Sequence, residues 1–322
     1  MGESMAVLLF VCAVAAVYLF AACALVRAAL RRFGFMERPT RGALVAERGS
    51  LALAAAGLLC FAYGYFVEPY WPQVTRVRVE SPKLKGAQRP VRVVHISDLH
   101  CDPVTRLEER LPDIVAAERP DLIVFTGDSI NSPEGLPVLR KLLPRLAAVA
   151  PTYAVRGNWD TWYWRREELF GGTGVTELKK EAARVDVAGT SLWVAGAPYA
   201  SFDEPTGERE GIEKMLSGVP PEAFTLFLYH TPDLILEAAA TGRVDLYCAG
   251  HTHGGQVALP FYGALVTLSK FGKKYESGLH REGPTWLYVT RGVGMEGGPA
   301  PRVRFFARPE VTVIELAPPP GG

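Results

Sequence analysis

Seven residues with metal-binding side chains occur in five short motifs of the sequence. They are Asp98, His100, Asp128, Asn158, His230, His251 and His253. Carboxylate, imidazole and amide donors together suit borderline divalent ions such as Mn, Fe or Zn, and they differ from the thiolate sets of structural zinc sites. Seven donors exceed the need of one tetrahedral ion, but they suit two ions that share a bridging carboxylate. Two adjacent ions can activate water and stabilise displacement at phosphorus. The pattern therefore predicts hydrolysis of phosphate esters or anhydrides by a metal-bound hydroxide, without a further catalytic side chain.

Each motif follows a short apolar run that predicts a β-strand. These runs span residues 91–97, 122–126, 152–155, 191–195, 224–229, 244–248 and 286–289. Helix-like stretches at 107–118, 136–148 and 233–240 separate several of them, and this alternation is typical of an α/β domain. Loops at the carboxyl ends of strands are where open α/β sheets place their sites. We therefore expect five loops from one sheet edge to converge on a single point.

The motifs, in this order, resemble the calcineurin-like metallophosphoesterase family over about residues 91–316. They read Asp98-Leu-His100, Gly127-Asp128, Gly157-Asn158, His230 and Gly250-His251-Thr-His253. The longer string 250–256, with 275–278 and 291–294, resembles a branch of bacterial, often membrane-associated phosphoesterases. The resemblance implies a four-layered α/β sandwich with two metals at the strand ends. It also implies that Asp98, His100 and His253 hold one metal, that Asn158, His230 and His251 hold the other, and that Asp128 bridges them.

One position departs from the family pattern. Many members carry a histidine after the Gly-Asn pair, and that residue is assigned to protonate the leaving oxygen, but here the position is Trp159. An indole N–H only donates, so it cannot do acid–base work, and a positioned acid is typically worth about 10²–10⁴-fold in rate. Two interpretations stay open. In one, the substrate leaves as a phosphate anion, as from a pyrophosphate link, and needs no proton. In the other, another group or a water supplies the proton.

Residues near this departure are candidates for further roles. Enzymes that cleave UDP-2,3-diacylglucosamine are similar in carrying a residue other than histidine, an arginine, at the position of Trp159. We expect Trp159 and Gln256 to contact substrate and Asp160 to orient a neighbour. The aromatic run 161–164 predicts an apolar wall, a contact with a bilayer, or ordinary packing under a loop.

The bulk composition excludes one large class of partner. The chain of 322 residues has 35 basic and 34 acidic side chains, so it lacks the basic excess typical of a nucleic-acid-binding protein. The five cysteines show no zinc spacing and no disulfide framework. We divide the chain into an anchor at 1–72 and a phosphoesterase domain at 73–322, with its core at 91–316 and a neck at 68–90.

Two apolar runs precede the domain. Residues 5–26 and 51–67 are uncharged and reach the roughly 17–25 residues of a membrane-spanning helix, although a buried core helix is the alternative for each. The runs predict a hairpin of two transmembrane helices in a bacterial cell membrane. Six arginines lie between them, at positions 27, 31, 32, 38, 41 and 48, and place this loop in the cytoplasm and the domain outside.

An anchor favours a phosphorylated, lipid-linked small molecule as substrate, and UDP-2,3-diacylglucosamine is the most specific candidate. That nucleotide is made in the cytoplasm, so this substrate and the outward orientation conflict. The alternatives are a non-catalytic metal-binding scaffold of the same fold and a phosphomonoesterase or protein phosphatase. The presence of all seven ligand-type residues favours an enzyme, because clustered carboxylates without a metal would be costly.

Overall fold

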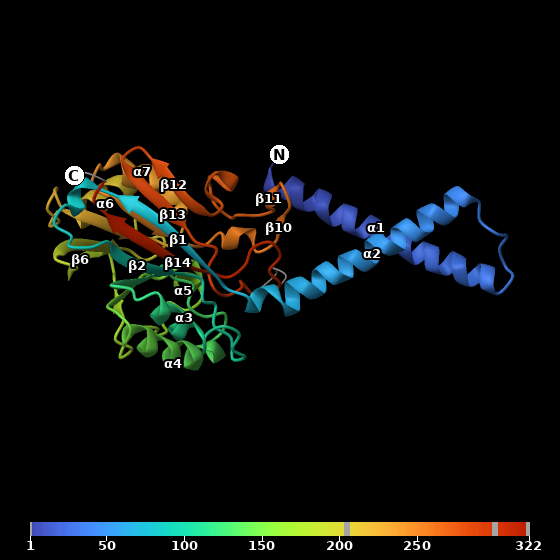
Figure 1. The fold of residues 1–322 in the computed structure, drawn as a ribbon, viewed down its shortest axis with the longest axis horizontal. Coiled ribbons are helices and arrows are strands. Elements are labelled where there is room, and N and C mark those ends of the chain that lie inside the picture. Colours follow the sequence, from blue (N-terminus) through green and yellow to red (C-terminus); the bar gives the residue numbers. More distant parts are fainter. Residues whose placement is uncertain (1, 203–206, 298–301, 320–322) are drawn as a thin grey trace. The chain divides into compact units, whose positions relative to one another are not determined.

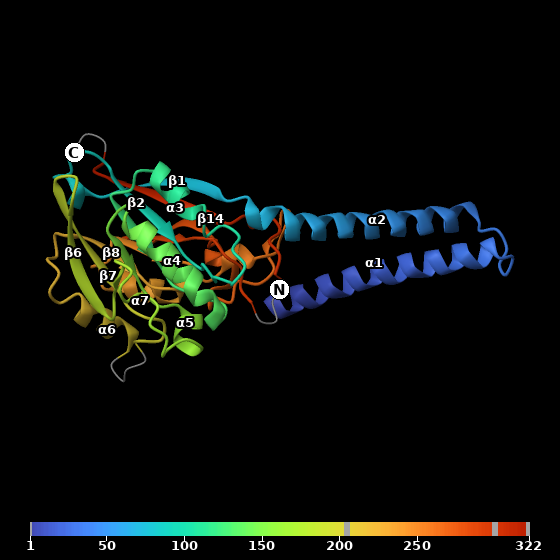
Figure 2. The same cartoon turned by 90° about the horizontal axis from the view of Figure 1, so that it is seen from below.

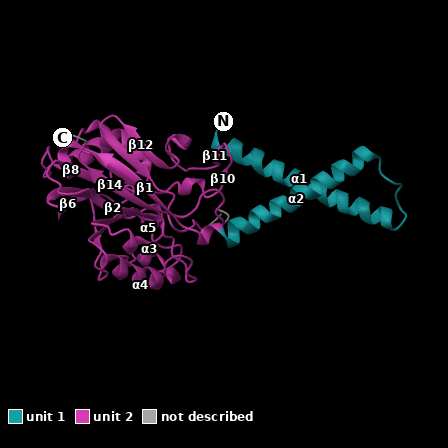
Figure 3. Ribbon diagram, viewed as in Figure 1, with its two compact units in different colours: residues 1–67 teal, residues 68–322 magenta. Residues whose placement is uncertain are grey.

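The chain forms two compact units, residues 1–67 and 68–322 (Figure 3). A computed structural model describes residues 2–202, 207–297 and 302–319. The first unit consists of helices α1 (Glu3–Arg32) and α2 (Arg41–Phe66). They pack against each other where the Tyr18 hydroxyl donates to the carbonyl of Ala54 at 3.3 Å and where Arg31 pairs with Glu47.

Both helices are long and apolar enough to cross a membrane. The alternative of a buried core helix would require that other parts of the chain cover their apolar side chains. Instead, only 11% of the most apolar window of each helix is buried, and residues such as Phe20 and Leu59 are exposed. The helices therefore display exposed apolar side chains along their length.

The second unit contains two six-stranded sheets. The first has the order β1 (Gln73–Glu80), β14 (Glu310–Ala317), β2 (Val91–Ile96), β3 (Leu122–Phe125), β4 (Thr152–Ala154), β5 (Thr176–Glu177). The second has the order β12 (Gly278–Glu282), β13 (Thr285–Val289), β9 (Leu246–Ala249), β8 (Phe224–Leu228), β7 (Thr190–Gly196), β6 (Glu181–Val187). The strands from β2 to β5 are parallel in the first sheet, and β7, β8, β9 and β13 are parallel in the second.

The strands have apolar residues on both faces because both faces of each sheet are covered. In β2, Val91 and Val93 join an apolar cluster that also includes Leu226 of the second sheet, so this cluster fills the space between the sheets. The opposite face of β2, with Val94 and Ile96, packs under helices.

Helices cover the two outer faces. The first sheet packs against α3 (Leu111–Ala117) and α4 (Leu136–Ala147), and the second packs against α6 (Glu208–Met215) and α7 (Ile235–Ala240). Figures 1 and 2 show this order of helices, sheet, sheet and helices, which confirms the predicted four-layered α/β sandwich. The remaining elements are α5 (Asn158–Trp162), the pair β10 (Ala258–Leu259) and β11 (Gly263–Ala264), and 3-10 turns at Glu68–Tyr70, Pro82–Leu84, Pro133–Gly135, Pro232–Leu234, His253–Gly255 and Gly272–Tyr275.

Two expectations about this unit were wrong. The segment 68–90 is not a neck, because Gln73–Glu80 forms β1 in parallel register with β14, and Val79 and Leu84 are buried. Charged residues alternate along β1 because it is an edge strand with little burial, and this pattern conceals a strand from an apolar-run search. The second error was the expectation that all five motifs follow strands of one sheet, since the strands that carry them belong to two sheets.

Candidate metal centre

The seven ligand-type residues follow five strands at their carboxyl ends. From the first sheet, Asp98 and His100 follow β2, Asp128 follows β3, and Asn158 begins α5 after β4; from the second sheet, His230 follows β8, and His251 and His253 follow β9. The face-to-face packing of the sheets brings these loops together. The centre therefore lies at the junction of the sheets and uses donors from both.

Five of the donors surround a common space at short distances. Oδ2 of Asp128 lies 3.5 Å from Nε2 of His100 and 3.2 Å from Nε2 of His230. Oδ1 of Asp98 lies 3.4 Å from Nε2 of His253 and 3.9 Å from Nε2 of His230. Ligand atoms that face one another at such distances are suited to hold a cation between them.

The donors form two overlapping groups. One comprises Asp98, His100 and His253, and the other comprises Asp98, Asp128 and His230, with the ligand atoms of each group within 4.8 Å of one another. Histidine rings also pair, because His100 lies 5.1 Å from His253 and His230 lies 5.1 Å from His251 between ring centroids. This pairing agrees with the two-metal assignment that the family resemblance implies, which stays a prediction for the individual residues.

Several of these atoms are buried without a hydrogen-bond partner among the described residues. They are both ring nitrogens of His100, Nε2 of His230 and Oδ1 of Asn158. Burial of unpaired polar atoms is costly, and ions can supply the missing interactions. The donor set and these atoms thus fit a site for two divalent ions.

Backbone carbonyls fix which ring nitrogen of two histidines faces the centre. Nδ1 of His230 lies 2.7 Å from the carbonyl oxygen of Thr126, and Nε2 of His251 lies 3.2 Å from the carbonyl oxygen of Leu268. A carbonyl only accepts, so in the neutral rings these nitrogens carry the proton and the opposite nitrogens have the free lone pair that a metal ion would bind. Metal-binding histidines are oriented in this way.

Burial and charge shift the pKa values in the cluster. Burial favours neutral forms, lowering the pKa of His100 to about 4 and raising that of Asp98 to about 7. Burial alone would lower the pKa of His230 too, but the carboxylates of Asp128 and Asp98 raise it to about 9. The proton of His230 thus balances negative charge that a metal ion would balance in its place.

The loops approach too closely for side chains at the motif glycines. A Cβ at Gly157 would lie 2.1 Å from Oδ1 of Asp128, and one at Gly250 would lie 2.3 Å from Oδ2 of Asp98. The ligand loops are also strained, because Asp98, Asp128 and His251 have positive φ angles of 51°, 58° and 71°. Such conformations concentrate at functional sites, where the surrounding structure maintains them.

Asp160 orients its neighbours as expected. Its fully buried carboxylate accepts hydrogen bonds from the backbone N–H groups of Asp128, Ser129 and Gly157 at 2.9–3.0 Å. The loops after β3 and β4 are joined through this carboxylate. Burial, reinforced by the charge of Asp128, raises the pKa of Asp160 to about 6, although the backbone donors lower it.

Comparison with known proteins places this geometry in a family. Residues 91–255 match the family model of the calcineurin-like phosphoesterases. The metallophosphoesterase YkuE of Bacillus subtilis is 32% identical over 285 residues, which cover 84% of this chain and 95% of that protein. The chain belongs to the calcineurin-like phosphoesterases. Like other members of this family, it is a phosphoester hydrolase that uses divalent metal ions.

Two further relatives differ in how much of their own length the match covers. Phosphodiesterase YaeI of Escherichia coli is 31% identical over 293 residues, which cover 85% of this chain and the whole of that protein. A protein of Danio rerio is named "transmembrane protein with metallophosphoesterase domain", and it is 28% identical over 283 residues. These residues cover 83% of this chain and 62% of that relative. This calcineurin-like phosphoesterase therefore resembles a named phosphodiesterase over the full length of that relative.

The two residues predicted to contact substrate lie beside the centre. The backbone N–H of Trp159 donates to Oδ1 of Asp128 at 2.9 Å, and its ring meets that of His100 edge to face at 5.3 Å. Gln256 is buried and follows the turn that contains His253. Contact with substrate remains a prediction for both. Of the nearby aromatics, Trp164 packs against the core, whereas Trp162 and Tyr163 are 58% and 60% exposed.

Sequence reasoning missed two residues near this phosphoesterase centre. Arg304 is fully buried; it donates to the carbonyls of Gly292, Gly294 and Ala307, and its Nη2 lies 3.4 Å from Nδ1 of His253. Glu296 accepts from the indole N–H of Trp159 at 3.3 Å. Both lie in the long connection between β13 and β14, and only their position beyond the end of a predicted strand could have signalled them.

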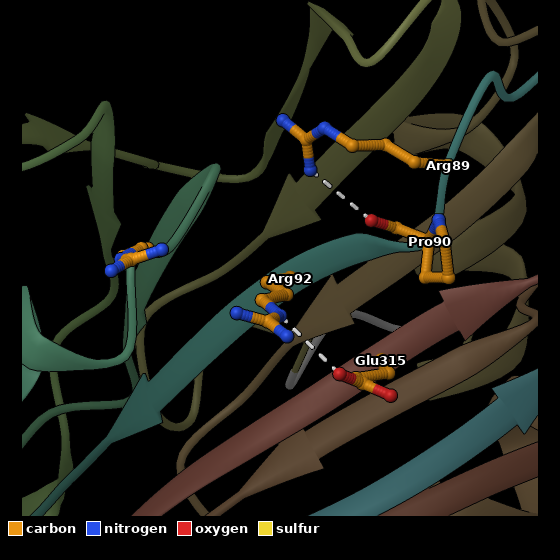
Figure 4. A pocket seen from close by; sticks show the side chains of 5 residues that line it. Arg89, Pro90, Arg92 and Glu315 are labelled. Atoms are coloured by element: carbon orange, nitrogen blue, oxygen red, sulfur yellow. Dashed lines mark hydrogen bonds and ion pairs between the residues drawn. The ribbon is translucent and has the colours of Figure 1, made fainter.

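A polar pocket of about 380 Å³ lies at the opposite end of β2 from the centre (Figure 4). It is lined by Arg89, Pro90, Arg92, Arg119 and Glu315. Arg92 pairs with Glu315, and Arg89 pairs with Asp121 outside the lining. No ligand-type residue of the centre lines this pocket, so it is separate from the site of hydrolysis.

Proposed function

We propose that this chain is a dinuclear phosphodiesterase, anchored in a membrane by α1 and α2, that hydrolyses an amphiphilic phosphodiester or pyrophosphate. One observation carries the dinuclear assignment: the carboxylate of Asp128 lies between His100 and His230, which belong to different histidine pairs. A bridging ligand requires such a position. Bound ions would supply a hydroxide near neutral pH and charge for the phosphoryl oxygens.

The protein's own residues define and hold the centre. Asp98, His100 and His253 would bind one ion, and Asn158, His230 and His251 would bind the other, with Asp128 between them. Asp160 holds the backbone of the Asp128 loop, and the carbonyls of Thr126 and Leu268 orient two of the histidines. These contacts support a pre-organised centre whose ligands need little rearrangement to bind metal.

Exposed apolar side chains near the centre support an amphiphilic substrate. The exposed Tyr163 lies beside Trp159, with ring centroids 5.0 Å apart, and the exposed Trp162 meets Tyr163 edge to face at 6.4 Å. Leu268, whose carbonyl contacts His251, is 57% exposed. Aromatic and aliphatic groups beside a polar reaction centre suit a phosphate ester that carries an acyl or isoprenoid chain. UDP-2,3-diacylglucosamine has this chemistry and is a substrate to test.

The activity is tested with the full chain, purified in mild detergent and loaded with Mn²⁺ or Zn²⁺. We expect two ions per chain by elemental analysis and hydrolysis of bis(4-nitrophenyl) phosphate. The variant Asp128→Asn should lose both, whereas Asp113→Asn, at an exposed position on α3, should keep both. Preference for 4-nitrophenyl phosphate would indicate a phosphomonoesterase instead. Metal binding without hydrolysis of any phosphate substrate would indicate the non-catalytic scaffold.

The anchor and its orientation are tested in membranes. We expect the full chain to sediment with the membrane fraction and to resist extraction by carbonate. Protease treatment of intact cells and of inverted vesicles then shows which side carries the domain. Cleavage in intact cells supports the outward orientation that the six arginines predict. Cleavage only in inverted vesicles would reverse it and admit a nucleotide-linked substrate made in the cytoplasm.

A further inference from the structure

The structure offers an acid close to the position where Trp159 replaces the expected histidine. The indole Nε1–H of Trp159 donates to Oε1 of Glu296 at 3.3 Å. The same tryptophan ring contacts His100, and its backbone contacts the carboxylate of Asp128. Trp159 therefore connects the carboxyl group of Glu296 to the ligands of the metal centre.

Glu296 occupies a fixed position. Its backbone N–H donates to Oε1 of Gln256 at 2.8 Å. Asn131 holds the residues on either side, since its Nδ2 donates to the carbonyl of Met295 at 3.1 Å and its Oδ1 accepts from Gly297 at 3.2 Å. The same Nδ2 also lies 3.0 Å from the carbonyl of His100. The segment that carries Glu296 is thus tied directly to the backbone of a metal ligand.

The carboxyl group of Glu296 is suited to hold a proton. Its side chain is half-buried, and only Oε1 has a hydrogen-bond partner among the described residues. Burial raises the pKa of Glu296 above the usual value for glutamate, and the negative charge of Asp128 raises it further. The hydrogen bond from the indole of Trp159 and the positive charge of His230 lower it. Asp128 and His230 are the charged groups that act on it from the loops after β3 and β8.

We propose that Glu296 is the general acid of this phosphoesterase and that Trp159 orients its carboxyl group. The inference rests on the proposed function. As the hydroxide oxygen forms a bond to phosphorus, the bond from phosphorus to the leaving oxygen breaks, and its electron pair takes the proton of Glu296. An alcohol departs, and the glutamate carboxylate regains a proton from water. The substrate class is therefore phosphodiesters with an alcohol leaving group, which need a proton, rather than anhydrides, which do not.

The kinetic test compares leaving groups in the Mn²⁺-loaded full chain. The variant Glu296→Gln keeps an oxygen to accept from Trp159 but has no proton to give. We expect it to lower kcat on an alkyl phosphodiester such as a glycerophosphodiester by about 10²–10⁴-fold, the usual worth of a general acid, and to keep kcat on bis(4-nitrophenyl) phosphate within about threefold. Glu109→Gln, an exposed control with the same change, should alter neither.

A second readout does not depend on turnover. All six tryptophans lie in residues 68–322, so their fluorescence reports on the catalytic unit. In metal-free protein, ionisation of Glu296 beside the indole should change the fluorescence with a midpoint above the usual glutamate range. The change should be absent in Glu296→Gln and in Trp159→Phe. Trp159→Phe should also lower kcat on the alkyl ester more than on the aryl ester, because it removes the orienting donor.

Each result decides one question. The acid role would be overturned if Glu296→Gln, at unchanged metal content, lowered kcat equally on the alkyl and the aryl phosphodiester. It would also be overturned if this variant lowered kcat on neither ester. A wild type that cleaves only anhydrides would overturn it too and favour departure without a proton. If Glu296→Gln loses its metal, the acid role is decided by the kcat of Trp159→Phe on the alkyl ester and by the fluorescence titration of the wild type. The assignment is overturned if that kcat is unchanged and the fluorescence does not respond to pH. A metal-loaded wild type that cleaves no phosphoester would refute the proposed function itself.

Discussion

Gly157→Ala is the substitution for which the structure gives the clearest magnitude. The backbone angles of Gly157, φ −83° and ψ −172°, are open to alanine, so only the space around the new methyl group matters. That methyl carbon would lie 2.1 Å from Oδ1 of Asp128 and 2.6 Å from its backbone nitrogen. Ordinary contact would require the Asp128 loop to move by about 1 Å, whereas ligand distances tolerate only about 0.2 Å.

We expect two separable effects of Gly157→Ala. In metal-free protein, the clash should lower the free energy of unfolding by about 1–3 kcal/mol, as overpacking of a buried site does. With metal at about 1,000 times its Kd, the wild type gains roughly 4 kcal/mol, and the variant should lose most of this gain. Urea unfolding followed by tryptophan fluorescence measures both effects, and calorimetry measures metal affinity directly.

Gly218→Ala is the matched control, because nothing lies within 4 Å of a Cβ at that position. It should unfold within about 0.5 kcal/mol of the wild type and bind metal with unchanged affinity. If Gly157→Ala behaves like this control in both measurements, the close approach of the two loops does not set the position of Asp128.

Three further predictions concern the surroundings of the centre. Asp160→Asn should weaken metal binding about 10–100-fold in calorimetry, because it loosens the loop of Asp128, whereas the exposed Asp113→Asn should not; equal affinities would refute the orienting role. Arg304→Met should leave the carbonyls it contacts without donors and lower the free energy of unfolding by about 1–3 kcal/mol for each carbonyl. The thermal midpoint should fall accordingly, and a midpoint equal to that of the exposed control Arg209→Met would contradict this. Removal of metal by a chelator should lower the thermal midpoint of the wild type by about 10 °C and Mn²⁺ should restore it; no shift in differential scanning fluorimetry would show that the ions contribute little to stability.

The sequence predicted the strands that precede the ligand-type residues well, because their pattern is locally encoded. A short apolar strand that ends in Asp98 or Asp128 needs no knowledge of the fold to be recognised, and the spacing of His251 and His253 is visible in one motif. The strands β2, β3, β4, β8 and β9 that carry these motifs all occur within about two residues of the predicted runs.

The remaining features depend on contacts between distant residues. The sequence does not show that β2 and β8 belong to different sheets, because strand periodicity carries no information on pairing partners. It also does not show that Glu296 meets Trp159, which lies 137 positions away in the chain. β1 was mistaken for a neck because an exposed edge strand has no continuous apolar run.

The division of the centre between two sheets has a consequence for biogenesis. Asp98, His100, Asp128 and Asn158 are synthesised well before His230, His251 and His253, and neither set alone has the donors for two ions. The first sheet is complete only at the end of synthesis, because it includes β14, the last strand of the chain. A nascent chain that has folded only β2 to β5 therefore exposes an incomplete set of ligands. Stable binding of both ions requires that the second sheet has packed against the first, so metal binding is a late step of folding that stabilises the contact between the sheets.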